Sequence, residues 1–443
     1  MLKRIYFKLI LIGYYLKKSW VYWLVGVSIG FLLYIGRGHL VKIKQLPTFQ
    51  KQYVGVAGRY TTANLPSEIN DLLTYGLTTF TENKKVIASP IVESIYQEDD
   101  NHRYIIKLKD NIFWHNGKKL TAADINYNLA GAVIKPEDSL TLMITTPNLF
   151  SPLLAALNQP LYKKNLIGLG PNKAIQIDYQ GGYLKKLVIQ NRDSKIKTVY
   201  KFYFSDPDLI TAFKLGEVDK IETNLLPTDI EKWNNVNLNQ KISPDKKYLA
   251  VFLNTEKLNN KSIRQALAYA TPKTKDRHER ALSPISPNSW AYNPTVKEYN
   301  FDPERAKELL GETDLGQLKI AVADRQLLNT AENIKKSWHD ILGIEVETQI
   351  VNKIDPQNFD AFLAYGGILA DPDQYLFWHS TQTQTNLTKF NNSRIDKLLE
   401  EGRQTFDPIE RKKIYQDFQK YLLEECPAIF LSYPTIYTIS RLK

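Results

Sequence analysis

Residues 19–36 contain no charged side chain, and this uncharged run is the feature that most constrains what the chain can fold into. An α-helix needs about 20 mostly apolar residues to cross the hydrocarbon core of a bilayer, so the run is just long enough. Positive side chains flank it, five before and three after: Lys3, Arg4, Lys8, Lys17, Lys18, Arg37, Lys42 and Lys44. We therefore expect one transmembrane helix at 19–36.

The flanks of this run predict its orientation. Trp20, Tyr22 and Trp23 lie at one end and Tyr34 at the other, as in the aromatic belts of membrane helices. The larger number of positive residues on the N-terminal side favours a cytoplasmic N-terminus at 1–18 and a large extracytoplasmic domain after a linker at 37–46. A cleaved signal peptide is the alternative, but no A-x-A site and no lipid-accepting cysteine follow the run.

Charge and cysteine content restrict the class of the remaining chain. The net charge is +11, but eight of the 58 basic residues and no acidic residue lie in 1–46. The other 397 residues carry 50 basic and 47 acidic groups, so no broad nucleic-acid-binding surface is expected. The single cysteine, Cys426, excludes an intrachain disulfide and a multi-cysteine metal site.

A mixed α/β pattern follows the linker. Short runs rich in β-branched and aromatic residues predict strands at 104–108, 198–204, 248–254, 318–323, 345–351, 359–365 and 428–433. A helical pattern at 330–342 joins two of them into a βαβ unit at 318–351, which implies parallel pairing. Asp-Pro pairs at 206, 302, 371 and 407 each precede a helical pattern and predict N-caps. Thr121 and Asp124 form an approximate capping box before a predicted helix at 125–132.

No arrangement of residues predicts catalysis. A G-x-S-x-G pattern at 26–30 lies inside the predicted membrane span, where a nucleophile turn could not form. The six histidines are scattered without metal-ligand spacing, and no phosphate-binding loop is present. We expect a protein that is not an enzyme and has no metal or cofactor.

The segment 365–380 is the best candidate for a binding loop. Gly366 and Gly367 end a predicted strand and allow close backbone approach, while Trp378 and His379 add stacking and hydrogen-bonding groups. Packing of its aromatic residues against the core is the competing interpretation. Asp371 and Asp373 could contact a ligand, but helix capping equally explains Asp371.

Several segments together resemble the family 5 extracellular solute-binding proteins, which are the peptide and nickel receptors of ABC importers. Residues 87–129 match the family's W-x-x-G-x-x-L-T-A-x-D region at Trp114, Gly117, Leu120, Thr121, Ala122 and Asp124. GLGP at 168–171 is similar to the family's G-T-G-P-Y turn, with Leu169 and Asn172 departing from it. Segments 204–222 and 248–270 also follow the family order, which covers about 50–440.

The resemblance implies a two-lobed periplasmic-binding-protein-like fold of type II with hinge strands. Lobe I would comprise 47–250, with a small subdomain at about 79–165, and the chain would return to it at 428–443. Lobe II would comprise 251–427. Peptide-binding members commonly place an Asp at the position of Ile368 to pair with the peptide's ammonium group, so that anchor is missing here.

The resulting prediction is a monomeric receptor at the cell membrane that closes two lobes over a small solute or oligopeptide and delivers it to an ABC permease. The expected ligand contacts are Arg59, Tyr60, Thr61, Tyr365, Gly366, Gly367, Asp371, Asp373, Trp378, His379 and Asn386. The alternative is an anchored structural or sensory ectodomain that keeps the fold without transport, which the loss of the amine partner at Ile368 makes plausible.

Overall fold

The computed structural model describes residues 13–14, 17–18, 20–22, 24–26, 28, 30–31, 51–98, 101–129, 131–227, 229–351 and 355–442. Contacts divide the chain into two units, one formed by Met1–Gln52 with Lys195–Lys197 and the other by all remaining residues. The described residues of 13–31 are helical and exposed. Half of the predicted anchor at 19–36, and the whole linker at 37–46, lie outside the described residues. Within the described part of the chain, no helix is both long and apolar enough to cross a membrane.

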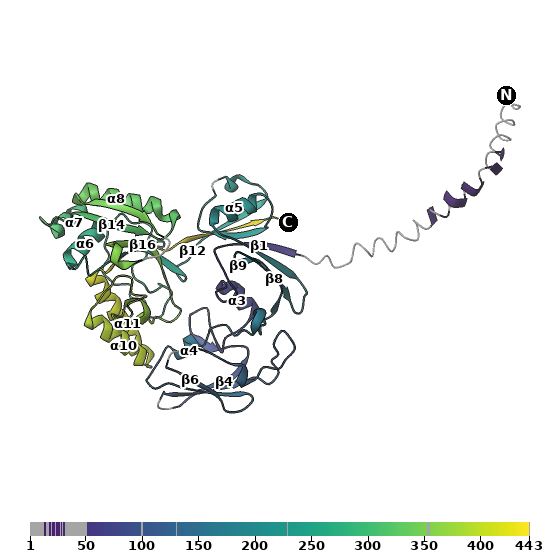
Figure 1. Cartoon of the computed structure of the whole chain (residues 1–443), viewed down its shortest axis with the longest axis horizontal. Coiled ribbons are helices and arrows are strands. Elements are labelled where there is room, and N and C mark those ends of the chain that lie inside the picture. The colour runs from purple at the N-terminus through teal and green to yellow at the C-terminus, as the bar shows by residue number, and fades with distance from the viewer. Residues whose placement is uncertain are drawn as a thin grey trace, which may run out of the picture. The chain divides into compact units, whose positions relative to one another are not determined.

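A seven-stranded mixed sheet forms the first large layer of the second unit (Figure 1). Its order is β12 (Val236–Ile242), β18 (Thr435–Arg441), β11 (Lys220–Thr223), β1 (Lys51–Ala57), β10 (Lys197–Tyr203), β9 (Tyr183–Asn191) and β8 (Asn172–Gln180). Two helices bury apolar side chains on it. Those of α3 (Ser67–Leu73) pack against Leu187 and Ile189, and those of α5 (Asp206–Lys214) against Ile221 and Ile439.

A small antiparallel sheet follows α3 in the chain. Its order is β4 (Val92–Gln97), β5 (Arg103–Leu108), β7 (Thr141–Thr145) and β6 (Val133–Pro136), and the hairpin of β2 (Thr78–Phe80) and β3 (Val86–Ala88) precedes it. Trp114 is buried beneath it and donates its indole N–H to Asp124 Oδ2 at 3.1 Å. The capping box of Thr121 and Asp124 is confirmed. The helix predicted after it is wrong, because the chain makes one 3₁₀ turn at Ala122–Asp124 and no regular helix at 125–129.

The second large sheet has five strands. Their order is β15 (Glu345–Ile350), β14 (Gln317–Val322), β16 (Ala361–Gly367), β13 (Lys247–Leu253) and β17 (Ala428–Ser432). The predicted βαβ unit is confirmed, because β14 and β15 pair in parallel and α8 (Leu328–Leu342) joins them. All seven predicted strands are present, with ends displaced by one or two residues.

Helices cover both faces of the five-stranded sheet, and the buried residues of β13 alternate accordingly. Leu249, Val251 and Leu253 pack with α6 (Lys261–Tyr269), α7 (Pro303–Leu310) and α8. The intervening side chains pack with α10 (Ser393–Gln404) and α11 (Pro408–Glu425) on the opposite face (Figure 1). A strand with two buried faces must be apolar at every position, which explains why 248–254 shows no polar alternation.

The Asp-Pro pairs do not all have the same role. Asp302 and Asp407 are N-caps whose carboxylates accept backbone N–H groups of α7 and α11, as predicted. At α5 the cap is Ser205, so Asp206 is the first helical residue. Asp371 caps no helix, because α9 (Tyr375–Trp378) begins with Gln374 at its N-cap position.

The chain passes between the two large sheets twice. The first passage separates β12 from β13 and the second separates β17 from β18. The two segments touch, because the N–H of Ser243 donates to the carbonyl of Pro434 at 3.0 Å. Since β17 belongs to the five-stranded sheet, the return occurs at 433–434 and not at 428, and the first passage ends before Lys247 and not at 250.

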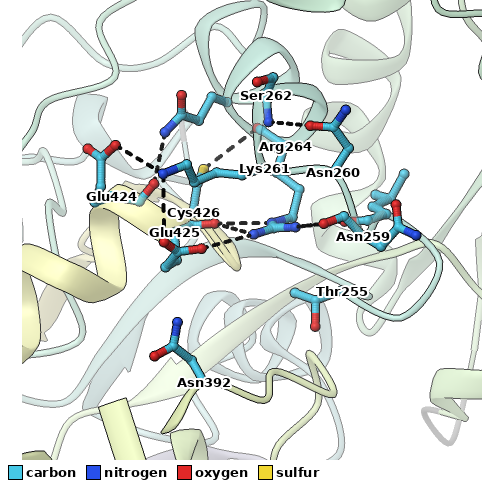
Figure 2. Close-up of polar contacts among 12 residues, drawn as sticks. Thr255, Asn259, Asn260, Lys261, Ser262, Arg264, Asn392, Glu424, Glu425 and Cys426 are labelled. Carbon is cyan, nitrogen blue, oxygen red and sulfur yellow. Dashed lines mark hydrogen bonds and ion pairs between the residues drawn. The ribbon is translucent and has the colours of Figure 1, made fainter. Parts of the chain in front are cut away.

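Buried Arg264 fastens α6 to the end of α11 (Figure 2). Its guanidinium donates to the carbonyls of Leu258 and Asn259, both at 2.9 Å, and to Glu425 O at 2.6 and 3.1 Å. Cys426 follows in a left-handed conformation with φ of 50°, and its Sγ lies 3.6 Å from the Arg264 carbonyl. These contacts join the start of lobe II's first helix to the segment that leads into β17.

We expect Arg264→Gln to lower the free energy of unfolding by about 3 kcal/mol, because it leaves buried carbonyls without donors. Chemical denaturation of the full chain in detergent would measure this. Arg305→Gln is the matched control, since Arg305 is half-exposed and pairs only with Glu308 within α7. Equal stability of the two variants would contradict the assignment.

Candidate functional site

Polar side chains of the two large sheets meet beside the first chain passage. We call this group the inter-sheet cluster, and its members are Tyr60, Glu68, Asp206, Lys246, Lys247, Asp324, Gln326 and Tyr365. The first three lie after β1, in α3 and in α5, on the side of the seven-stranded sheet. The last three lie after β14, in the turn that follows it and in β16, on the side of the five-stranded sheet. The two lysines lie where the chain passes from one to the other. Such a group can contact a ligand from both sides.

Strand ends and helix starts place the carboxylates of this cluster. Asp206 follows the end of β10 and opens α5. Asp324 follows the end of β14, and its carboxylate accepts the backbone N–H of Gln326 at 2.9 Å. The side-chain amide of Gln326 donates to Asp206 Oδ2 at 3.2 Å, and Lys246 forms an ion pair with Glu68. The first contact joins α5 to the turn after β14, and the second joins α3 to the first chain passage.

Lys247 is the cation of the cluster that has no direct anionic partner among the described residues. Its ammonium lies 4.1 Å from the ring centroid of Tyr365. Burial lowers the pKa of Lys247, and the nearby carboxylates of Asp206 and Asp324 partly oppose this shift. Burial also raises the pKa of Tyr365 and of Tyr60. Lys247 is therefore a partly desolvated cation facing two carboxylates that it does not contact.

The predicted residues after β1 lie around this cluster. Tyr60 belongs to it and packs on Phe202 with ring centroids 5.7 Å apart. The Arg59 guanidinium lies 5.3 Å from the Phe204 ring centroid, and Thr61 donates its hydroxyl to Asn64 Oδ1 at 2.8 Å. A pocket of about 340 Å³ is lined by Gly58 and Phe204 among others, and Arg59 is not one of its lining residues. Only Tyr60 of the three has an electrostatic connection to the cluster.

Of the predicted residues at the end of β16, one belongs to the cluster and two do not. Tyr365 belongs to the cluster. A Cβ on Gly366 would lie 2.3 Å from Cζ of Tyr248, so glycine is required there by packing. Gly367 has open space around it. Ile368 packs against the core on the α10 and α11 face, and its N–H donates to the Lys246 carbonyl at 3.0 Å.

Asp371 and Asp373 are paired with arginines, contrary to their prediction as ligand contacts. Asp371 receives two hydrogen bonds from Arg411, at 2.9 and 2.6 Å. Asp373 Oδ2 accepts hydrogen bonds from Nε and Nη2 of Arg403, at 3.0 and 2.9 Å. Both carboxylates are largely buried, so their charge is compensated within the protein. The acidic pair therefore holds the loop to Arg403 and Arg411.

Arg403 also takes part in a second contact between the halves of the unit. Its guanidinium lies 3.7 Å from the Tyr375 ring centroid and 5.5 Å from that of Phe150, which belongs to the segment after the small sheet. Ser151 donates its N–H to the Arg403 carbonyl at 2.7 Å and its hydroxyl to Gly402 O at 3.1 Å. This contact and the inter-sheet cluster are separate connections.

Trp378, His379 and Asn386 are buried. Trp378 packs against Phe252 and Phe430, and its buried indole N–H has no acceptor among the described residues. His379 contacts Thr381 Oγ1 at 2.8 Å and Glu400 Oε1 at 3.3 Å. The amide of Asn386 donates to the Phe390 carbonyl at 2.8 Å and accepts from Thr388. The competing interpretation, packing against the core, describes these three better, and the proposal below leaves them out.

Sequence reasoning did not find Asp206, Lys247 and Asp324 as site residues. A usable signal existed, because Asp206 and Asp324 lie three and two residues after the ends of β10 and β14. Ligands of α/β proteins bind beyond the carboxyl ends of strands. The Asp-Pro pattern directed attention to capping instead. Among the described residues, no group of three or more His, Cys, Asp or Glu side chains could hold a metal ion.

Two α/β halves joined by two adjacent chain passages define a two-lobed binding protein. The profile of the bacterial extracellular solute-binding proteins, family 5 (Middle), matches residues 190–386. This match covers less than half of the chain, and over these residues the chain is similar to the family.

Two curated relatives match most of the chain. The oligopeptide-binding protein AppA of Bacillus subtilis is 25% identical, with 85% of this chain and 83% of AppA covered. The nickel-binding protein NikA of Staphylococcus aureus is also 25% identical, with 80% and 82% covered.

Solved structures share the two-lobed fold. NikZ from Campylobacter jejuni in complex with Ni(L-His) has a TM-score of 0.75 and 22% identity, and the match covers 89% of this chain and 94% of NikZ. AppA from Bacillus subtilis in complex with a nonapeptide has a TM-score of 0.72 and 21% identity, covering 88% and 94%.

We expect Asp371→Ala to destabilise the full chain by about 3–5 kcal/mol without any ligand, because it leaves the Arg411 charge buried and unpaired. Urea denaturation of the purified protein would measure the loss. Glu304→Ala is the control, since Glu304 is exposed and pairs with Lys307 on the surface of α7. If the variant were as stable as the unaltered protein but bound solute more weakly, Asp371 would be a ligand contact and not a structural residue.

Proposed function

We propose that the chain is the extracytoplasmic solute-binding receptor of an ABC importer, and that it holds a peptide or peptide-like small solute between its lobes. Lobe I contains the seven-stranded sheet with the small antiparallel sheet, and lobe II contains the five-stranded sheet. The observation that carries the proposal is the inter-sheet cluster, in which side chains of both lobes meet. A solute bound there stabilises the closed arrangement through contacts to both lobes at once.

The charges of the cluster suit a solute that carries both an ammonium and a carboxylate group. Lys247 can donate to a carboxylate, because its ammonium contacts only the Tyr365 ring among the described residues. Asp206 and Asp324, one from each lobe, can accept hydrogen bonds from an ammonium group. They would replace the amine anchor that Ile368 lacks. Tyr60 and Tyr365 supply apolar walls with polar tips.

The location of the receptor forms part of the proposal. Residues 19–36 would anchor it in the cell membrane as a single helix, and the linker at 37–46 would keep the lobes near the permease. Proteins similar to this chain include a dipeptide-binding protein from Escherichia coli and the oligopeptide-binding AppA, which supports a peptide-like solute.

The direct test is to identify what the protein retains. The full chain would be purified in detergent from bacterial membranes and denatured, and the released small molecules would be analysed by mass spectrometry. We expect peptides or peptide-like zwitterions that rebind the emptied protein in calorimetry. Failure of all extracts, peptide libraries and nickel–histidine complexes to bind would favour the non-transporting ectodomain and overturn the proposal.

We expect Lys247→Met to weaken binding of the identified solute about 10- to 100-fold, because a charge-assisted hydrogen bond to a carboxylate is lost. In the unaltered protein, affinity should fall on the alkaline side at a lower pH than an ordinary lysine would cause, since burial lowers the pKa of Lys247. Titration calorimetry across pH would check both. Lys307→Met, on the exposed surface of α7, should bind as tightly as the unaltered protein. If the Lys247 variant bound the solute as tightly as the unaltered protein, Lys247 would not be part of the binding site.

A further inference from the structure

A small cavity lies inside lobe II, apart from the inter-sheet cluster. It has a volume of about 10 Å³, which gives room for one water-sized sphere. Its charged lining residues are Lys273, Arg280 and Lys297, and the other lining side chains are apolar apart from the Tyr299 phenol. No carboxylate is among the described residues that line it. A cavity with cations and no carboxylate among its described lining residues favours an anion.

Lys297 and Tyr299 already have partners. The Lys297 ammonium lies 3.3 Å from Glu424 Oε2, and the Tyr299 hydroxyl donates to the Leu423 carbonyl at 2.8 Å. The charges that need compensation are therefore those of Lys273 and Arg280.

Lys273 is a buried cation without an ion-pair partner among the described residues. Its ammonium donates to the carbonyls of Ala268 and Thr271, the latter at 3.0 Å, which leaves one of its three N–H groups. Burial lowers its pKa well below the ordinary value, and the nearby Arg280 lowers it further. An anion against this group would stabilise the charged form.

Arg280, which also lines this cavity, has a buried donor. Its Nη2 donates to the Tyr299 carbonyl at 3.3 Å, whereas Nη1 is buried and has no acceptor among the described residues. Burial lowers the pKa of Arg280 to about 10, and Glu298 acts against this shift. A buried guanidinium N–H without an acceptor is costly, because the group gives up its hydrogen bond to water on folding.

We propose that this cavity binds a single monoatomic anion, chloride under ordinary conditions, between Lys273 and Arg280. A chloride ion can accept the free N–H of Lys273 and Nη1 of Arg280 together, and it compensates a positive charge that water leaves uncompensated. Because the space admits about one water-sized sphere, a monoatomic anion suits it better than phosphate or sulfate.

The site lies where an anion would affect the second chain passage. Arg280 forms a β-bridge with Ser432 at the end of β17, and the N–H of Tyr433 donates to the Glu279 carbonyl at 2.7 Å. The anion would therefore hold the segment at 273–280 against the strand that leads back to lobe I.

Thermal unfolding of the full chain in detergent tests the proposal in solution. Chloride would be exchanged for gluconate at constant ionic strength. We expect the Tm to rise by roughly 2 °C for each tenfold increase of chloride above the dissociation constant. Arg280→Gln and Lys273→Met should each abolish this dependence. Arg277→Gln should keep it, because the Arg277 side chain is 87% exposed and lies outside the cavity lining.

Crystals of the unaltered protein grown in bromide supply a readout that does not depend on folding of the variants. We expect an anomalous bromide signal in contact with Lys273 Nζ and Arg280 Nη1. The proposal would be overturned by a water at that position or by bromide bound only elsewhere. It would also be overturned if the Tm of the unaltered protein did not change with chloride concentration. None of these outcomes bears on solute binding at the inter-sheet cluster.

Discussion

The pairing of two adjacent strand continuations is the constraint on which the rest of this structure depends. β13 and β17 pair in the five-stranded sheet, and their continuations β12 and β18 pair in the seven-stranded sheet. The chain therefore passes between the lobes twice at one place, where Ser243 and Pro434 are hydrogen-bonded. Any relative movement of the lobes has to bend both segments together, because each strand is held on either side by a ladder of hydrogen bonds.

The position of this double passage also explains where the charged groups gather. Lys246 directly precedes β13 and Lys247 is its first residue, while Asp206 and Asp324 follow the ends of β10 and β14. Partial burial strengthens electrostatic interaction, so each charge counts for more here than on an open surface. The second connection, between Ser151 and the Gly402–Arg403 segment, has a different character, because an internally paired arginine and backbone carbonyls make it.

The binding loop of the sequence prediction shows how one pattern supports two outcomes. A loop rich in aromatic, acidic and amide side chains is typical of a ligand site, and equally of a loop that must bury itself. In this protein the observed contacts favour a loop that is buried against the protein. They are the Asp371–Arg411 and Asp373–Arg403 pairs and the packing of Trp378. The arginines lie 30 and 40 positions away in the chain, so no local pattern could have paired them with the acids.

Local rules were sufficient for the strands, the βαβ unit, and the caps at Asp302 and Asp407, because each depends on residues within a few positions of one another. The ordered motifs of 87–129, 168–171 and 204–270 were likewise enough to predict the family and its two-lobed fold. Tertiary structure alone decided which polar residues are free to meet a ligand. Lys247 and the Asp371 carboxylate are both charged and partly buried, but one faces an aromatic ring and the other a guanidinium. That difference arises from long-range packing, and the free energy of a buried charge depends on its neighbours in space and not on those in the chain.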